Sequence, residues 1–333
     1  MIKRMVVGGV PNPIGGVTNF IYRMAERNYV DIIIDIYPSH TKRIPDSYKG
    51  DFISFKNVFS FILSLFFNKD IVKDVIHVNF NFSRPRSLFL FLLIRTRKEI
   101  SFSLMLHHGS LKTRLPKFLI SFLLRKFDRI YYLSKDQYDF YVSYLGDSSA
   151  LKQSSSYIPV SKPSSHSVSD DFKQYLDDVG VYYLASGYCT PIYNHHWIID
   201  GFIKNSSDKT LILFLYGQID DDYLAIMKRK IGSHKNVRLI FNKSAEEFNY
   251  ALSRSNGYIR PNSKDSFGIA TADAVNFGVE VLASDVCRRY TGVCLFSPTN
   301  FETFSNALDT FLENPSALKR SLECPNSFLF HLS

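Results

Sequence analysis

The sequence has few of the features that mark disulfide-rich, metal-binding or membrane-spanning proteins. Its 333 residues contain only four cysteines, with no CxxC pair and no histidine at a metal-ligand spacing. This argues against a disulfide framework and a zinc site and fits a reducing cytoplasm. The longest apolar runs, residues 59–67 and 88–94, are far shorter than the roughly 20 residues that cross a bilayer. The apolar stretch at the N-terminus is too short for a signal peptide, so we expect a soluble or peripheral protein.

Positive charge is concentrated in the first half of the chain. Residues 1–150 contain 22 Lys and Arg against 12 Asp and Glu, whereas the remainder contains 18 against 19, and the formal net charge is +9. A basic half indicates an anionic partner, such as phosphate groups, nucleic acid or an acidic membrane. A solvated lysine-rich face is an equally good interpretation. No aromatic and basic recognition motif supports nucleic acid.

Short β-rich runs alternate with amphipathic segments, which predicts βαβ units and parallel sheets. We expect strands at residues 5–10, 31–36, 74–80, 101–107, 128–134, 155–159, 181–186, 210–216, 236–241, 256–261, 279–284 and 292–297. The Pro- and Ser-rich stretch 159–171 reads as a linker. We therefore predict domains at 1–160 and 161–310, followed by a tail, 311–333, that returns to the first domain.

Two glycine loops follow predicted strands. Gly15 and Gly16 precede a helix near Thr18, and glycines there allow backbone N–H groups to approach a phosphate. A tight turn explains this stretch equally well. No GxGxxG pattern is present, so a dinucleotide cofactor is set aside. In the second half, the loop that begins at Gly187 could contact a donor diphosphate, yet it carries His195 and His196 and no Lys or Arg.

Other polar groups end strands where α/β sheets place reactive side chains. His107 and His108 follow an apolar strand and could bind a sugar hydroxyl or a phosphate, or simply lie at a surface turn. The acids of QIDDDY, residues 218–223, suggest a metal site. A helix N-terminus is the better interpretation, because acids directly after a turn favour that position.

The stretch RPNSKDSFGIATADAVNFG, residues 260–278, keeps two acids eight positions apart. Arg260 ends a strand, and residues 266–277 read as a helix that ends at Gly278. Eight residues are about two helical turns, so Asp265 and Asp273 could face one ligand. An N-cap at Asp265 and a solvated Asp273 would explain this stretch taken alone.

Taken together, these motifs resemble the retaining GT-B glycosyltransferases of the family 4 type, over roughly residues 5 to 300. The resemblance rests on the glycine loops, the His-Gly pair, the segment IRPNSKDSFG and the later DVCRRYTGVCLF. It implies an α/β GT-B fold, in which two Rossmann-like domains face each other across a cleft. The first domain would bind the acceptor and the second a UDP- or GDP-sugar, without a metal or other cofactor.

The resemblance also implies site residues. The family's histidine falls on His108, near the reacting sugar, and its first glycines on Gly15 and Gly16, beside the diphosphate. Asp265 would address donor sugar hydroxyls and Asp273 the ribose. The backbone of the loop between them would also contact the donor sugar, at Ser266, Phe267 and Gly268.

The chain departs from the family in its phosphate loop. Tyr188 and Tyr193 stand where an Arg and a Lys are expected, and both family glutamates are aspartates. The nearest groups that could balance the leaving diphosphate are Arg260, Lys264, His195 and His196.

The predicted acceptor is a lipid-linked glycan. Residues 114–129 combine an apolar stripe with cations, which is typical of a helix in a membrane interface. The predicted membrane contacts are Lys117, Phe118, Phe122, Arg125 and Lys126, although Phe118, Phe122 and Leu123 could equally be core. We expect a retaining glycosyltransferase of bacterial surface-polysaccharide assembly, cytoplasmic and peripheral on the inner membrane. The alternatives are a sugar-nucleotide epimerase and a catalytically weak GT-B subunit that assists a partner.

Overall fold

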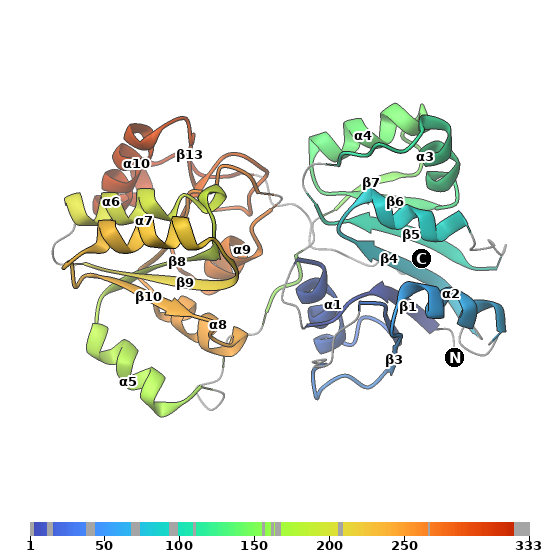
Figure 1. Cartoon of the computed structure of the whole chain (residues 1–333), viewed down its shortest axis with the longest axis horizontal. Coiled ribbons are helices and arrows are strands. Elements are labelled where there is room, and N and C mark those ends of the chain that lie inside the picture. Colours follow the sequence, from blue (N-terminus) through green and yellow to red (C-terminus); the bar gives the residue numbers. More distant parts are fainter. Residues whose placement is uncertain are drawn as a thin grey trace. The chain divides into compact units, whose positions relative to one another are not determined.

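The computed structural model describes the chain from residue 3 to residue 322 with several gaps. The described ranges are 3–11, 16–37, 44–67, 74–92, 99–108, 111–154, 157–160, 163, 168–205, 209–265 and 267–322. The chain divides into two compact units, one containing Met1–Ile158 and the other Pro159–Pro325. Each unit has its own sheet (Figure 1).

The first unit alternates strands and helices around a seven-stranded parallel sheet with the order β3-β2-β1-β4-β5-β6-β7. Its strands are β1 (Lys3–Gly8), β2 (Ile32–Asp35), β3 (Asp51–Ser54), β4 (Val75–Phe82), β5 (Ser101–Leu106), β6 (Arg129–Tyr132) and β7 (Leu151–Gln153). Its helices are α1 (Gly16–Glu26), α2 (Val58–Phe67), the 3-10 helix η2 (Pro85–Leu92), α3 (Lys117–Leu124) and α4 (Lys135–Leu145).

The second unit has a six-stranded parallel sheet with the order β10-β9-β8-β11-β12-β13. Its strands are β8 (Tyr182–Cys189), β9 (Thr210–Ile219), β10 (Val237–Phe241), β11 (Gly257–Arg260), β12 (Val281–Ser284) and β13 (Cys294–Phe296). Its helices are α5 (Asp170–Val179), η4 (Pro191–Tyr193), α6 (His195–Asn205), α7 (Asp221–Ile231), α8 (Ala245–Arg254), α9 (Ile269–Asn276), α10 (Phe301–Glu313) and η5 (Pro315–Ala317).

Both sheets reverse their strand order once. Successive strands run outward from β8 through β9 to β10, and the chain then returns to place β11 on the other side of β8. The same reversal occurs between β1 and β4 in the first unit. In open α/β sheets, ligands bind outside the carboxyl ends of the strands at such a switch point. The second unit therefore has a candidate ligand position after β8 and β11.

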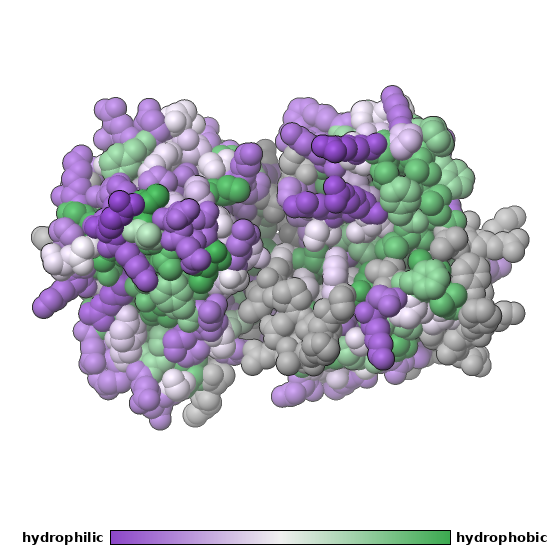
Figure 2. Space-filling view, in the orientation of Figure 1, coloured by the Kyte–Doolittle hydropathy of each residue, from purple (hydrophilic) through white to green (hydrophobic). Residues whose placement is uncertain are grey.

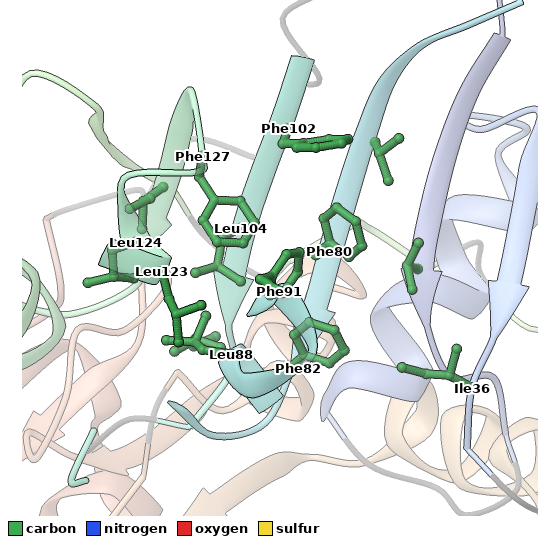
Figure 3. Packing of buried hydrophobic residues seen from close by; sticks show 14 of the residues in the cluster. Ile36, Phe80, Phe82, Leu88, Phe91, Phe102, Leu104, Leu123, Leu124 and Phe127 are labelled. Carbon is green, nitrogen blue, oxygen red and sulfur yellow. The ribbon is translucent and has the colours of Figure 1, made fainter. Parts of the chain in front are cut away.

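The central strands of each sheet are buried on both faces, as parallel sheets require. Along β9, Leu211, Leu213 and Leu215 belong to one apolar cluster, and the residues between them belong to another. In the first unit, Figure 3 shows the aromatic side of the core, where Phe91 of η2 lies close to Phe80 and Phe127, with ring centroids 4.6 Å apart in each pair. The apolar runs at residues 210–216 and 101–107 are therefore buried strands, whereas the longest runs form α2 and η2, which each bury one side and expose another.

Most predicted strands are confirmed within one to three residues at each end. The strand expected at 155–159 is wrong where the structure describes it, because Tyr157–Pro159 are not in a strand and β7 comes earlier. The strand β3 was not predicted, because its DFIS sequence is short and mostly polar at its ends. The helix α5 starts at Asp170, inside the stretch expected to be linker.

The helix expected at 266–277 starts three residues later. Its N-cap is Gly268, whose φ of +78° places it in the left-handed region, so α9 contains Asp273 but not Asp265. The two acids are therefore not two turns apart on one helix, and that part of the geometric prediction is wrong. Ser266 lies outside the described residues.

Residues 311–322 pack against the second unit. Phe311 is 2% exposed in its core, and Arg320 forms an ion pair with Glu280 at 3.0 Å. The rest of the predicted returning tail, residues 323–333, lies outside the described residues. No helix in the described ranges is long and apolar enough to span a membrane.

Candidate functional site

The candidate site is formed by the loops that follow β8 and β11 at the switch point of the second sheet. Hydrogen bonds join these two loops. Asn194 Nδ2 donates to the carbonyl of Pro261 at 2.8 Å, and the N–H of Ser263 donates to the carbonyl of Ile192 at 2.9 Å. The loop after β8 and the start of the loop after β11 are therefore joined through residues 192–194 and 261–263.

Aromatic rings cover the glycines at this edge of the sheet. A Cβ atom on Gly187 would lie 2.0 Å from Cδ1 of Tyr193, and one on Gly217 would lie 2.8 Å from Cε1 of Tyr188. The two tyrosine rings are neighbours, with centroids 5.8 Å apart. Gly187 was predicted to admit a donor phosphate, but in the structure the ring of Tyr193 occupies the space above it.

Arg260 ends β11 beneath these rings and is 8% exposed. Its guanidinium carbon lies 5.6 Å from the centroid of the Tyr193 ring, within the range of a cation–π contact. Its Nε donates to Oδ2 of Asp265 at 2.6 Å. Nη1 and Nη2 of Arg260 donate no hydrogen bond to any other described residue.

Asp265 is shared by two arginines. Its Oδ2 also accepts a hydrogen bond from Nη1 of Arg289 at 2.7 Å, and its side chain is 9% exposed. Burial alone would raise the pKa of this carboxyl, but Arg260 and Arg289 outweigh that effect and hold its pKa well below the usual value. Asp265 is therefore ionised, and two cations and one anion leave this cluster with a net charge of about +1.

Arg289 was not singled out from the sequence. It is 1% exposed, and its Nε donates to the carbonyl of Ser284 at 2.9 Å while Nη1 donates to the carbonyl of Phe267 at 3.1 Å. The available signal was the basic pair in DVCRRYTGV, because a charge within an apolar segment is buried only with partners. The sequence does not reveal which arginine of the pair is buried or that its partner is Asp265.

Gly268 is the position where the loop meets α9. Besides its positive φ, a Cβ there would lie 2.5 Å from Nη1 of Arg289, so a side chain does not fit. Phe267 is 4% exposed, and its side chain is part of the interior. The first N–H groups of a helix have no partner within it, so the start of α9 adds a positive dipole end beside the arginines.

Other predicted donor residues differ in exposure. Asp273 lies within α9 and is 2% exposed, whereas Lys264 is exposed on the loop.

His195 is 1% exposed and its Nε2 lies 3.2 Å from the carbonyl oxygen of Tyr188, to which it can donate. Burial lowers the pKa of His195 to about 3, so it is neutral at neutral pH and cannot offer positive charge to a phosphate. Nδ1 of His196 lies 2.8 Å from Oη of Tyr223.

The structure confirms the preferred interpretation of residues 218–223 as the N-terminus of a helix. Asp220 is the N-cap of α7, and its carboxylate accepts a hydrogen bond from the N–H of Tyr223 at 3.0 Å. Asp221 and Asp222 lie in the first turn, where the helix dipole favours acids. Across the described ranges, no cluster of His, Cys, Asp or Glu is arranged to hold a metal ion.

In the first unit, the two neighbouring histidines differ. His108 is exposed after β5, and its carbonyl accepts a hydrogen bond from Gln137 Nε2 at 2.9 Å. His107 is 8% exposed and its Nε2 lies 3.0 Å from Oδ1 of Asn81. Burial lowers the pKa of His107 to about 3. Gly16 begins α1 and is exposed, and Gly15 lies outside the described residues.

His107 ends a chain of buried polar side chains between β4 and β5. Asn81 Nδ2 donates to Oδ1 of Asn79 at 2.6 Å, and Asn79 Nδ2 donates to Oγ of Ser103 at 2.7 Å. Ser103 Oγ in turn lies 3.0 Å from Nε2 of His77. For every bond to have a donor and an acceptor, His107 must carry its proton on Nε2.

The helix α3 has one buried and one exposed apolar face. Leu123 and Leu124 are fully buried, whereas Phe118 is 76% and Phe122 55% exposed. The core interpretation is therefore wrong for the two phenylalanines. Figure 2 shows hydrophobic side chains gathered over this part of the first unit. Exposed Phe89 and Leu92 of η2, which packs against α3, add to the apolar surface.

The cations of α3 are divided between the surface and the fold. Lys126 Nζ donates to the carbonyl of Phe91 and lies 5.2 Å from the centroid of the Phe122 ring. Arg125 Nη2 donates to the carbonyl of Leu145 at 3.2 Å, and Lys117 is exposed. We call Lys117, Phe118, Phe122, Phe89 and Leu92 the α3 surface.

Comparison of sequences identifies no relative, since no protein-family model and no curated protein matches the chain. Comparison with solved structures identifies proteins with a similar fold. Anabaena HepE in complex with UDP has a TM-score of 0.70 at 12% identity, covering 94% of this chain and 90% of that chain. A glycosyltransferase from Rickettsia africae has a TM-score of 0.69 at 14% identity, covering 93% and 89%. The lipopolysaccharide outer core galactosyltransferase WaaB has a TM-score of 0.59 at 12% identity, covering 93% and 90%. These similarities establish the architecture: the chain has the GT-B fold, with two α/β units that each contain a parallel sheet.

Proposed function

We propose that the protein is a retaining glycosyltransferase that moves a sugar from a nucleoside diphosphate to a hydroxyl of a lipid-linked glycan. The observation that carries the proposal is the positively charged cluster of Arg260, Asp265 and Arg289 at the switch point of the second sheet. The fold supports it, because HepE, which shares the fold, was solved with UDP.

The donor's diphosphate is the anion that this cluster suits. Nη1 and Nη2 of Arg260 form a planar fork that matches two phosphate oxygens. The start of α9 lies beside it and favours negative charge. Lys264, on the same loop, is exposed and adds a second positive charge. Arg260 thereby takes the role of the family's missing phosphate-loop cations, in an environment where Tyr188 and Tyr193 replace them.

The remaining donor contacts follow from the resemblance. Asp273 would bind the ribose hydroxyls, and the backbone at Phe267 and Gly268 the sugar. His108 would lie near the reacting sugar, and its exposure after β5 supports that role over the buried His107. Asp265 would reach sugar hydroxyls only while also bonded to two arginines.

Catalysis would depend on positioning and on stabilising the leaving diphosphate. As the glycosidic bond to the phosphate oxygen breaks, negative charge grows on the diphosphate, next to Arg260. The leaving oxygen would accept the proton of the acceptor hydroxyl, which attacks the same face of the sugar and so retains its configuration. This step requires no metal.

The acceptor proposal rests on the α3 surface. Exposed Phe118 and Phe122 would insert into the headgroup boundary, while Lys117 would attract anionic lipid. More exposed cations follow β4 and β5, the strands whose carboxyl ends form the ligand edge of the first sheet: Arg84, Arg86, Lys112 and Arg114. They suit the phosphate of a lipid-linked acceptor on the cytoplasmic face of the membrane, as in bacterial surface-polysaccharide assembly.

Donor screening tests the proposal. A thermal-shift series with UDP, GDP and their sugars should give one nucleotide that raises the melting temperature, because a ligand that binds the native state stabilises it. The matching sugar donor should then release nucleoside diphosphate when lipid-linked acceptor is present. Conversion of the donor without acceptor would instead indicate an epimerase. Binding without any turnover would indicate an assisting subunit, and no binding at all would refute the donor site.

A further inference from the structure

Arg289 makes contacts that extend beyond its neighbours in sequence. Three nitrogens of its guanidinium donate hydrogen bonds: Nε to the carbonyl of Ser284, Nη2 to Oγ of Ser284 at 3.1 Å, and Nη1 to both Phe267 and Asp265. Ser284 Oγ donates to the carbonyl of Asn262 at 2.7 Å. The loop from β11 to α9 is therefore held near its start through Ser284 and near its end by Arg289 itself.

The charge of Arg289 matters as much as its hydrogen bonds. Without it, Arg260 and Asp265 would form a simple ion pair with no net charge, and such a pair has little attraction for an anion. Arg289 binds the same carboxylate oxygen, 2.7 Å from its Nη1, so the negative charge of Asp265 is divided between two cations. The cluster therefore keeps a net positive charge, and Arg260 holds its part of that charge at the carboxyl end of β11.

We infer that Arg289 is a positioning residue for the donor diphosphate. It acts through Asp265: by binding the same carboxylate oxygen as Arg260, it leaves the guanidinium of Arg260 only partly neutralised. The inference rests on the proposed function, because the anion in question is the diphosphate of the donor. It also assigns Asp265 a role within the protein, as the carboxylate that connects the two arginines.

Removal of charges from the cluster, one at a time and together, provides the test. Titration calorimetry would measure binding of UDP and of inorganic pyrophosphate to the full-length protein and to Arg289→Gln, Asp265→Asn and the double variant. Arg289→Gln should weaken binding of both ligands about tenfold or more, equivalent to about 1.4 kcal/mol. The double variant removes one charge of each sign and should recover most of the loss. A purely structural role predicts the opposite, namely a double variant weaker than either single one.

Two further variants separate charge from folding. Arg289→Lys keeps the charge but not the planar fork, so anion binding should stay within about threefold of wild type. Should Arg289→Gln fail to fold, Asp265→Asn alone decides, because it raises the charge of the cluster and should strengthen pyrophosphate binding. Unchanged or weaker binding by folded Asp265→Asn would overturn the inference.

The control for overall charge is Arg254→Gln, which removes the same charge from an exposed pair with Asp177. It should bind UDP as the wild type does. A wild-type protein that binds neither UDP, GDP nor pyrophosphate would refute the donor site itself. Wild-type binding with an unaffected Arg289→Gln variant would refute only the role of Arg289.

Discussion

The ring of Tyr193 lies so close to Gly187 that a Cβ atom on the glycine would be 2.0 Å from it. Gly187 therefore makes room for a side chain of the protein itself. The ring in turn lies over Arg260, with its centroid 5.6 Å from the guanidinium carbon. A loop that would hold a basic phosphate site in the resembled family is packed here with an aromatic side chain.

This contact predicts a paired rescue. Gly187→Ala should lower the free energy of unfolding by about 1–3 kcal/mol, because the added methyl group overpacks the ring and the φ of +159° disfavours a side chain. Adding Tyr193→Ala should return the part of that loss that comes from overpacking, which denaturant titration would measure. Gly16→Ala is the matched control, since a Cβ there meets no atom within 4 Å. Independent, additive effects of the two substitutions would contradict the packing described.

Lowering the pH should destabilise the protein at pH values well above those at which carboxylates become protonated. In the folded state, burial lowers the pKa of His107 and His195 to about 3, whereas histidine in the unfolded state has a pKa of about 6.5. The unfolded state thus binds more protons, and the stability present above pH 6.5 is lost as the pH falls toward 3. Between pH 7 and 5 each residue should account for about 2 kcal/mol, measured by urea unfolding. His195→Asn and His107→Asn should each flatten this dependence, and an unchanged slope in both would contradict it.

Asp220 distinguishes a helix cap from a metal ligand. Asp220→Ala should lower the free energy of unfolding by about 1 kcal/mol through loss of the cap. Asp220→Ser keeps an acceptor for the N–H of Tyr223 and should recover most of that stability. Neither wild-type stability nor donor turnover should respond to Mg²⁺ or to a chelator. Loss of turnover on chelation would instead restore a metal-dependent mechanism.

Asp273 tests the ribose assignment. Asp273→Asn keeps the shape of the side chain but removes its charge, and it should abolish most of the thermal shift produced by UDP or GDP. Inorganic pyrophosphate has no ribose, so its binding should remain close to that of the wild type. Equal losses for pyrophosphate and nucleotide would mean that Asp273, at 2% exposure, serves the fold rather than the ligand.

The α3 surface predicts membrane binding without a cost in stability. Phe118→Ser with Phe122→Ser should reduce binding to vesicles that contain anionic lipid by about tenfold or more, given about 1.5–3 kcal/mol for each buried phenylalanine. Both side chains are largely exposed, so the melting temperature should stay nearly constant. Ile226→Ser, on exposed α7, is the control. Binding would be measured by vesicle flotation. If the wild-type protein does not float with these vesicles at low salt, the membrane proposal is wrong.

Local patterns in the sequence predicted much of the fold. The continuous apolar runs identified both parallel sheets, because a strand buried on two faces needs apolar residues throughout. The capping role of Asp220 also followed from its position after a strand and turn. By contrast, β3 has only four residues, of which Asp51 and Ser54 are polar, and gives little periodic signal.

The site was less predictable, because its contacts join distant segments. The motif led to Arg260 and Asp265, but Arg289 lies 24 residues beyond Asp265 and on another loop. The helix α9 begins later than expected because Gly268 adopts a left-handed φ of +78°, beside the guanidinium of Arg289. Composition alone also could not show that His107 is buried while His108 is exposed, or that the leucines of α3 are buried while Phe118 is exposed.

The strand order of the second sheet also has a consequence for the order of folding. Its central strand β8 pairs on one side with β9, which follows it directly in the chain. On the other side it pairs with β11, which is distant in sequence: Tyr182 and Asn256, which are hydrogen-bonded where the two strands begin, are 74 residues apart. Closing such a long loop is slow compared with local pairing. The contact of Arg260 with Tyr193 can form only after that closure. Recovery of pyrophosphate binding during refolding should therefore lag behind secondary structure and mark completion of the sheet.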